Sequence, residues 1–168
     1  MDGKSQQGMT LIELVIVIVI LSILVAVASI RLSNPAAITL TYQAELFAGH
    51  IRYLQSLALN WGCELNLNIT STTTYTVTSR QSYAGKACHT AAATINNPST
   101  QQPFSVSLSD SVQFSATSSL GFDSLGRPID TTTGVLLSSN TQFNMTAGGI
   151  IWRVTVSPVS GFVSLVKL

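Results

Sequence analysis

The chain has 168 residues, a formal net charge of +1, 9% charged residues and 46% hydrophobic residues. This length suggests one modest domain plus a hydrophobic segment. The eight basic residues are scattered, so the chain offers no broad electrostatic footprint for nucleic acid or anionic lipid. The composition therefore argues against a nucleic-acid partner.

The first element is the apolar segment "MTLIELVIVIVILSILVAVASI", the 22 residues from Met9 to Ile30. A helix of that length spans ~33 Å, the thickness of a bilayer core. A secretory signal peptide is the first alternative, but this core is long for one and its start, "MDGKSQQ", is nearly neutral. The second alternative is an ordinary membrane anchor. Lys4 before it and Arg31 after it give almost no charge asymmetry, so charge alone hardly sets its orientation. We predict a transmembrane helix over residues 9–30.

Glu13 is an unexpected residue in this segment, because a carboxylate near a membrane is costly and usually has a partner. Thr10 and Glu13 have the spacing of a capping box at a helix start. That interpretation requires the chain to begin close to Met9. A cut after Gly8 would provide such a beginning, together with a new positive amine for the carboxylate to meet.

"GMTLIEL" (8–14), followed by the apolar run, resembles the prepilin signal of type IV pilins and type II secretion pseudopilins, usually G-F-T-L-x-E. The resemblance implies a leader over residues 1–8. A prepilin peptidase would cut between Gly8 and Met9 and methylate the new Met9 amine. Glu13 would serve filament assembly by pairing with a neighbouring subunit's N-terminal amine. Met9 departs from the commoner phenylalanine, although other apolar residues occur there in the family.

Beyond the membrane, residues 31–62 are predicted to continue the helix as an amphipathic segment. Asn34-Pro35 should kink or locally melt it, and Gly62 should cap its end in the left-handed conformation. His50 on this helix is interpreted as a surface or interface residue rather than a ligand. The apolar face follows steps of four and three residues and comprises Leu40, Ala44, Phe47, Ile51, Leu54 and Ala58.

From residue 63 to 168 the hydrophobic period changes to two, which predicts a β-rich globular domain. Leu65, Leu67 and Ile69 should share one face of a strand, with a hairpin turn over Ser71 to Thr73. The predicted fold is α+β: a long N-terminal helix followed by a small antiparallel β-sandwich-like domain. After a loop over 82–102, further strands are predicted at 104–109, 112–116, 134–139, 141–146, 150–157 and 161–168.

The two cysteines, Cys63 and Cys88, are expected to form a disulfide if this domain lies outside the cytoplasm. It would close a loop of roughly 25 residues and stabilise the domain by about 3 kcal/mol. Free thiols remain an alternative. A metal site with His89 or His50 is another, but the usual zinc spacings are absent.

The architecture resembles the GspH/FimT branch of minor pilins and pseudopilins. "IRYLQSLALNWG" (51–62) is similar to that group's helix end, and "FDSLGRP" (122–128) to its turn between strands. Asp123 and Arg127 in this turn could make a functional contact. Turn chemistry, with a local Asp–Arg pair, is the alternative that we favour.

We find no catalytic constellation, metal site or cofactor motif, and we expect a structural subunit rather than an enzyme. "SLVK" (164–167) matches S-x-x-K but lies on a predicted strand, whereas that motif needs a helix. The resemblance implies a minor subunit that primes or caps a type IV pilus or a type II secretion pseudopilus. It also implies a single-pass inner-membrane precursor with a periplasmic C-terminal domain. Its partners would be other pilin or pseudopilin subunits, the prepilin peptidase and the inner-membrane assembly platform.

The alternative function is a pilus-associated binding subunit that presents the β domain to DNA or to a surface ligand. In FimT-like relatives that take up DNA, an arginine after the last hairpin's glycine makes the contact. Here Gly161 is followed by Phe162, and only Lys167 is basic nearby. Contacting several phosphates takes several cations, so a DNA site would require Arg80, Lys86 and Arg153 to converge in the fold.

Overall fold

The computed structural model describes residues 10–31, 35–80, 95–109 and 111–168, and the side chains of all of these except residues 27–31. The chain divides into two compact units, Met1–Pro35 and Ala36–Leu168.

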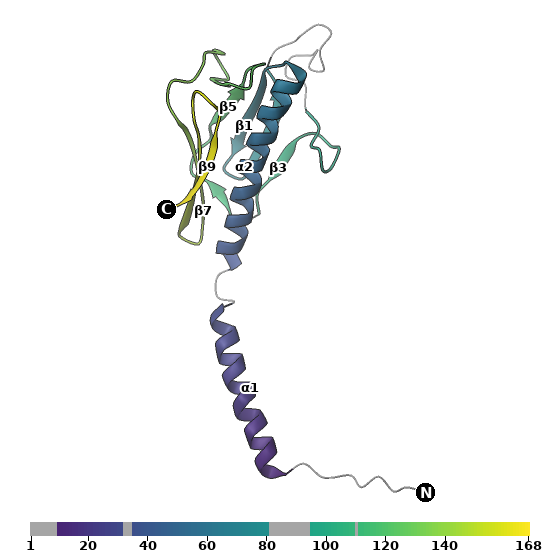
Figure 1. Ribbon diagram of the computed structural model, residues 1–168, viewed down its shortest axis with the longest axis vertical. Coiled ribbons are helices and arrows are strands. Elements are labelled where there is room, and N and C mark those ends of the chain that lie inside the picture. Colours follow the sequence, from purple (N-terminus) through teal and green to yellow (C-terminus); the bar gives the residue numbers. More distant parts are fainter. Residues whose placement is uncertain (1–9, 32–34, 81–94, 110) are drawn as a thin grey trace, which may run out of the picture. The chain divides into compact units, whose positions relative to one another are not determined.

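In the described part of the first unit, residues Leu11–Arg31 form the helix α1, of 21 residues (Figure 1). Its large apolar side chains between Leu11 and Val25 are 43–81% exposed. Among the residues whose side chains are described, no helix combines the length and the apolar character needed to cross a membrane. The predicted span over residues 9–30 begins and ends outside that set, and it stays a prediction.

The next helix is α2 (Pro35–Trp61), of 27 residues, which belongs to the second unit from Ala36 onwards. Proline suits the first helical position, because its missing N–H would have no partner there. The helix ends at Trp61. Gly62, the next residue, has a left-handed φ of 63°, and the Cys63 N–H donates to Ala58 O at 3.2 Å. This is a Schellman cap, and it confirms the predicted role of Gly62.

The buried face of α2 contains all six of the predicted apolar residues. It adds two more, because the contact surface is wider than a single stripe. The face consists of Leu40, Ala44, Phe47, Ala48, Ile51, Leu54, Leu57 and Ala58.

Two antiparallel sheets follow α2 (Figure 1), in the spatial orders β3-β2-β1-β5-β6 and β4-β7-β8-β9. The fold is therefore α+β with antiparallel sheets, as predicted. The five-stranded sheet contains β1 (Leu65–Ser71), β2 (Thr74–Ser79), β3 (Ser105–Ser107), β5 (Ser119–Phe122) and β6 (Pro128–Ile129). The four-stranded sheet contains β4 (Gln113–Phe114), β7 (Thr141–Ala147), β8 (Ile150–Val156) and β9 (Val163–Lys167).

Phe47 on α2 is the ring at which both sheets meet the helix. It is fully buried, and its ring centroid lies 5.0 Å from Tyr75 of β2, 5.0 Å from Phe114 of β4 and 5.3 Å from Phe143 of β7. All three contacts are edge-on, the arrangement that aromatic quadrupoles favour. Since the buried cluster around Phe47 is built entirely from residues of the second unit, this unit has a core of its own.

Two of the hairpins follow directly from the sequence. The β1–β2 pair has Leu67 opposite Val77 and Ser71 opposite Thr74, so its turn is Thr72–Thr73, and the predicted hairpin is confirmed. The β7–β8 turn is Gly148–Gly149, with φ values of 55° and 77°. Both positions need positive φ in a type I′ turn, which glycine adopts without strain.

The predicted strand over 134–139 is wrong. Only Leu136 makes a bridge there, with Ile129, and Gly134 has a left-handed φ of 74°. The segment is instead a loop in which the Asp130 N–H donates to Val135 O at 2.9 Å. The strands β5 and β6 were not predicted: β5 buries three consecutive residues and so lacks a period of two.

Candidate functional site

The start of α1 is a reciprocal capping box formed by Thr10 and Glu13. The Glu13 N–H donates to Thr10 Oγ1 at 3.3 Å, and the Thr10 N–H donates to Glu13 Oε2 at 3.0 Å. The Thr10 hydroxyl also donates to Glu13 Oε2 at 3.0 Å. Two N–H groups that have no partner within the helix are thereby satisfied. The predicted capping box is confirmed.

This arrangement fixes a carboxylate in the first turn of the helix, where the helix dipole favours negative charge. Both Thr10 and Glu13 are exposed, so the carboxylate is accessible from outside the chain. It can accept a hydrogen bond from, or form an ion pair with, an amine brought to it. The predicted cleavage and methylation positions, Gly8 and Met9, lie outside the described residues.

Cys63 follows the helix cap and is fully buried. Its predicted partner, Cys88, lies outside the described residues, as do His89 and Lys86. The disulfide between Cys63 and Cys88 therefore stays a prediction. Among the described residues, no group of three or more His, Cys, Asp and Glu side chains is placed to hold a metal ion.

Asp123 and Arg127 form the turn that connects β5 to β6, as the sequence predicted. Asp123 Oδ1 accepts from the N–H groups of Leu125 at 2.9 Å and Arg127 at 2.8 Å. Asp123 Oδ2 lies 2.7 Å from Arg127 Nη2 and accepts from its Nε at 2.8 Å. The ion pair is local, and it makes the turn rigid.

His50 is half-buried, rather than fully at the surface as the sequence suggested. Its Nδ1 lies 2.6 Å from the hydroxyl oxygen of Tyr75, and its ring packs edge-on against Phe104 at 4.9 Å. Burial lowers the pKa of His50, because the charged imidazolium loses its water, and it raises the pKa of Tyr75. The ring packs against the aromatic core of the second unit, and part of it stays exposed to solvent.

Arg80 at the end of β2 ties the loop after β6 to the β1–β2 hairpin. Its Nη1 lies 2.6 Å from Glu64 Oε2, its Nε donates to Thr131 O at 3.1 Å, and its Nη2 donates to Thr132 O at 3.2 Å. Gly134 has a left-handed φ of 74°, and a Cβ there would lie 2.7 Å from Arg80 Nη1, so glycine suits this position beside the guanidinium. No local pattern in the sequence predicts this contact, because its members are up to 70 residues apart.

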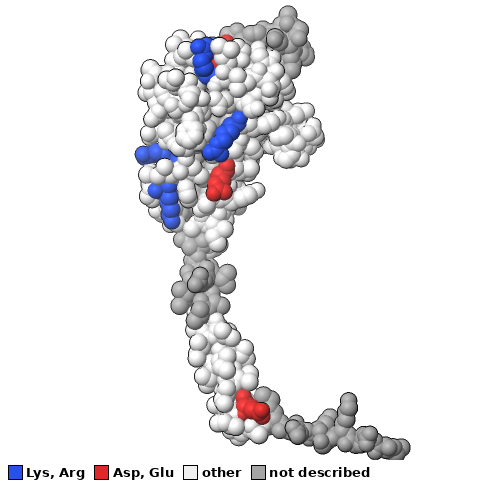
Figure 2. All heavy atoms as spheres, viewed as in Figure 1, with Lys and Arg blue, Asp and Glu red and all other residues white. Residues whose placement is uncertain are grey.

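These contacts bear on a DNA site built from Arg80, Lys86 and Arg153. Arg80 is engaged with Glu64, and Arg153 donates to Asn144 Oδ1 at 2.9 Å. Figure 2 shows a mostly uncharged surface on the face in view, with few Lys and Arg side chains. The described residues give no observation that favours a DNA-binding function.

Ser164 and Lys167 both lie on β9. Residues three apart on a strand point to opposite faces, so these two side chains cannot form an S-x-x-K pair.

Comparison with known proteins finds a sequence motif at the N-terminus and a similar fold. Residues 3–29 match the family model for the prokaryotic N-terminal methylation motif, and the chain has the fold of minor pseudopilins. Two structures of the minor pseudopilin EpsH from the type II secretion system of Vibrio cholerae are similar to it. The first has a TM-score of 0.52 and 18% identity, over 76% of this chain and 96% of that one. The second has a TM-score of 0.51 and 16% identity, over 76% and 93%.

A search of curated proteins finds no match to this chain. The resemblance to type IV pilins and pseudopilins is confirmed in two respects, the N-terminal motif and the fold. The GspH-like architecture predicted for the chain agrees with the EpsH minor pseudopilin fold.

Proposed function

We propose that the chain is the precursor of a minor pilin or pseudopilin, a structural subunit that primes or caps a type IV pilus or a type II secretion pseudopilus. The observation that carries the proposal is the capping box at Glu13, inside a segment that matches the N-terminal methylation motif. The minor-pseudopilin fold of the second unit supports the same class.

In this proposal, a prepilin peptidase cuts between Gly8 and Met9 and methylates the Met9 amine. Residues 9–30 hold the precursor in the inner membrane, and the β domain lies in the periplasm, where Cys63 and Cys88 pair. The assembly platform then transfers the helix into the filament. The exposed apolar side chains of α1 support this step, because they can pack against neighbouring helices.

Glu13 sets the register of the subunit by meeting the positive amine of a neighbouring chain. An ion pair in an apolar filament core fixes alignment better than it adds stability, since desolvation offsets much of the attraction. Thr10 holds one carboxylate oxygen in place before that encounter.

The test compares three variants of the full chain in its host. Gly8→Ala should leave the leader attached, as seen by the mass of the N-terminal peptide. Glu13→Gln keeps a hydrogen-bond acceptor for Thr10 but removes the charge, so it should be cleaved normally and be absent from sheared filaments. Thr10→Ala keeps the charge and should be incorporated better than Glu13→Gln. Normal incorporation of Glu13→Gln would refute the register role, and normal cleavage of Gly8→Ala would refute the leader assignment.

A further inference from the structure

Four large apolar side chains are exposed at the end of the second unit where α2 ends. Leu59 is 51% exposed, Leu125 63%, Val159 82% and Phe162 69%. They come from α2, from the turn between β5 and β6, and from the turn between β8 and β9. We call these four residues the α2-end patch. Single exposed apolar residues are ordinary on a protein surface, but a group of them marks a contact site.

Gln55 joins the three segments. Its Nε2 donates to Gly126 O at 2.8 Å and to Ser160 O at 3.0 Å, so one amide holds both turns against α2. A Cβ at Gly161 would meet this amide at 2.3 Å. Gly126 and Ser160 are the chain neighbours of Leu125 and Val159, which places those two patch residues on either side of Gln55.

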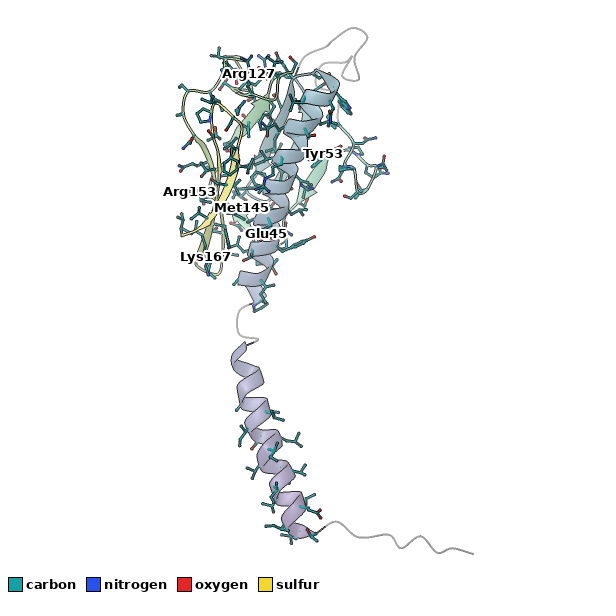
Figure 3. All side chains as sticks on the ribbon, in the orientation of Figure 1. Glu45, Tyr53, Arg127, Met145, Arg153 and Lys167 are labelled. Atoms are coloured by element: carbon teal, nitrogen blue, oxygen red, sulfur yellow. The ribbon has the colours of Figure 1, made fainter. Side chains whose placement is uncertain are left out.

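Leu59 completes the group, because it lies one turn after Gln55 on the same face of α2. A Cβ at Gly126 would lie 2.8 Å from Leu59 Cγ, so the β5–β6 turn rests directly on this leucine. Figure 3 places Arg127, at the end of that turn, at the same end of the unit.

The patch is formed before any partner arrives. The β5–β6 turn is fixed by the Asp123 hydrogen bonds, and in the β8–β9 turn the Gly161 N–H donates to Ser157 O at 3.0 Å. Little conformational entropy is therefore lost when a partner binds, which favours a specific contact.

The patch residues are uncharged, and few charged groups lie beside them: Arg52 donates to Val163 O at 3.1 Å, next to Phe162. Within residues 55–62, 122–128 and 157–162 the charged side chains are Asp123 and Arg127, which pair at 2.7 Å. The Arg127 side chain is 47% exposed and lies at the rim. A fitting partner surface is apolar and uncharged at its centre, with a carbonyl or carboxylate acceptor at its edge for the guanidinium.

The area of the patch limits the kind of partner that can bind there. Four side chains exposed to this degree amount to about 400 Å² of apolar surface, which is within the range of the largest patch on a typical monomer. A stable interface between free proteins needs about 800 Å² on each partner. The α2-end patch is too small to hold a second copy from solution, but it suffices for a neighbour that other contacts keep at high effective concentration.

We propose that the α2-end patch binds the globular domain of a neighbouring pilin-like subunit in the same filament, through an apolar, uncharged surface of that neighbour. This inference rests on the proposed function, which brings the two subunits together through their helices. It adds a specific contact between globular domains that determines which subunit stands next to this one.

The test uses the full chain in its host with a photo-crosslinking amino acid in place of Val159. The matched control carries it in place of Val166, which is 52% exposed and pairs with Arg153 on β8. Figure 3 shows Arg153 and Lys167 away from Arg127, so the control lies outside the α2-end patch. We expect an adduct from position 159 only, with a protein that mass spectrometry identifies as a second chain carrying its own N-terminal methylation motif.

A second arm measures incorporation of the double variant Leu125→Ser/Val159→Ser into sheared filaments, against Val166→Ser. We expect the incorporation of the double variant to fall at least about tenfold and that of the control to stay at the wild-type level. Residues 36–168 carrying both substitutions should melt as the wild type does, because the altered side chains are exposed.

The outcomes separate the two proposals. If the wild-type chain never enters filaments, the proposed function fails and this inference fails with it. If the wild type enters but position 159 gives no adduct, or an adduct with its own copy or with a protein lacking the motif, the inference alone is overturned. Equal incorporation of the double variant overturns it as well.

Discussion

The hydrogen bond between His50 and Tyr75 allows a quantitative test of the core. It joins α2 to β2 at 2.6 Å, and Tyr75 is fully buried. We consider His50→Phe, Tyr75→Phe and the double variant in residues 36–168, the unit that has its own core. Each single variant removes one partner and leaves the other polar group behind, whereas the double variant removes both.

The expected magnitudes follow from burial. His50→Phe leaves the Tyr75 hydroxyl in a site without water, which costs about 2 kcal/mol of unfolding free energy. Tyr75→Phe should cost about 1 kcal/mol, because the half-buried His50 can still reach water. The double variant should be less destabilised than the sum of the single variants by 1–2 kcal/mol, roughly.

The assay is urea unfolding at pH 8, followed by the fluorescence of Trp61 and Trp152. If the loss of unfolding free energy in the double variant equals the sum of the two single losses within about 0.3 kcal/mol, the hydrogen bond contributes nothing. That result would refute this reasoning.

The same pair gives a pH dependence. Burial lowers the pKa of His50 in the folded state below its ordinary value of 6.5, so the unfolded chain binds more protons between the two values. The contribution of the neutral histidine to stability is complete above pH 6.5 and is lost as pH falls through 6.5 towards the folded-state pKa. The unfolding midpoint of the wild type should fall over this range more steeply than that of His50→Phe. Parallel pH profiles would contradict the prediction.

Three further predictions concern glycines and Arg80. Gly161→Ala should cost at least about 2 kcal/mol, through left-handed strain plus the clash with Gln55, whereas Gly149→Ala meets no atom within 4 Å and should cost only about 1 kcal/mol. Equal losses in urea unfolding would exclude the clash. Gly49→Ala should stabilise the unit by about 0.5–1 kcal/mol, because α2 is helical there and its Cβ position is open. An unchanged or lowered midpoint would mean that the glycine has another role in the unit. Arg80→Met should cost about 2 kcal/mol and expose the backbone of residues 131–134 to hydrogen exchange; unchanged exchange would show that the arginine does not hold the loop.

The sequence predicted those parts of the fold that a local period determines. The steps of four and three along α2 identified its buried face, because one side of that helix meets the core along its whole length. The alternation in β1 identified Leu65, Leu67 and Ile69 as buried, since the other face of that strand carries polar side chains. The capping box was also readable, because Thr10 and Glu13 are only three residues apart.

The parts that were missed depend on contacts between distant residues. β5 is covered on both faces, so Leu120, Gly121 and Phe122 are all buried and show no alternation. Residues 134–139 look like a strand, but the guanidinium of Arg80 requires a loop that turns at Gly134. His50 looked exposed because nothing in its neighbourhood reveals that Tyr75 lies opposite it.

The strands at the margins of both sheets determine how the second unit can contact another protein. The five-stranded sheet ends in β3, of three residues, and β6, of two, and the four-stranded sheet ends in β4, of two, and β9, of five. The longest of these is β9, and its first residue is contacted by Arg52 of α2, which donates to Val163 O at 3.1 Å. Edge strands that are short, or whose backbone is bonded by a side chain, offer little free backbone for strand addition. The second unit is thereby protected against strand exchange and aggregation through its sheet edges, so its contacts with other proteins are left to its side chains.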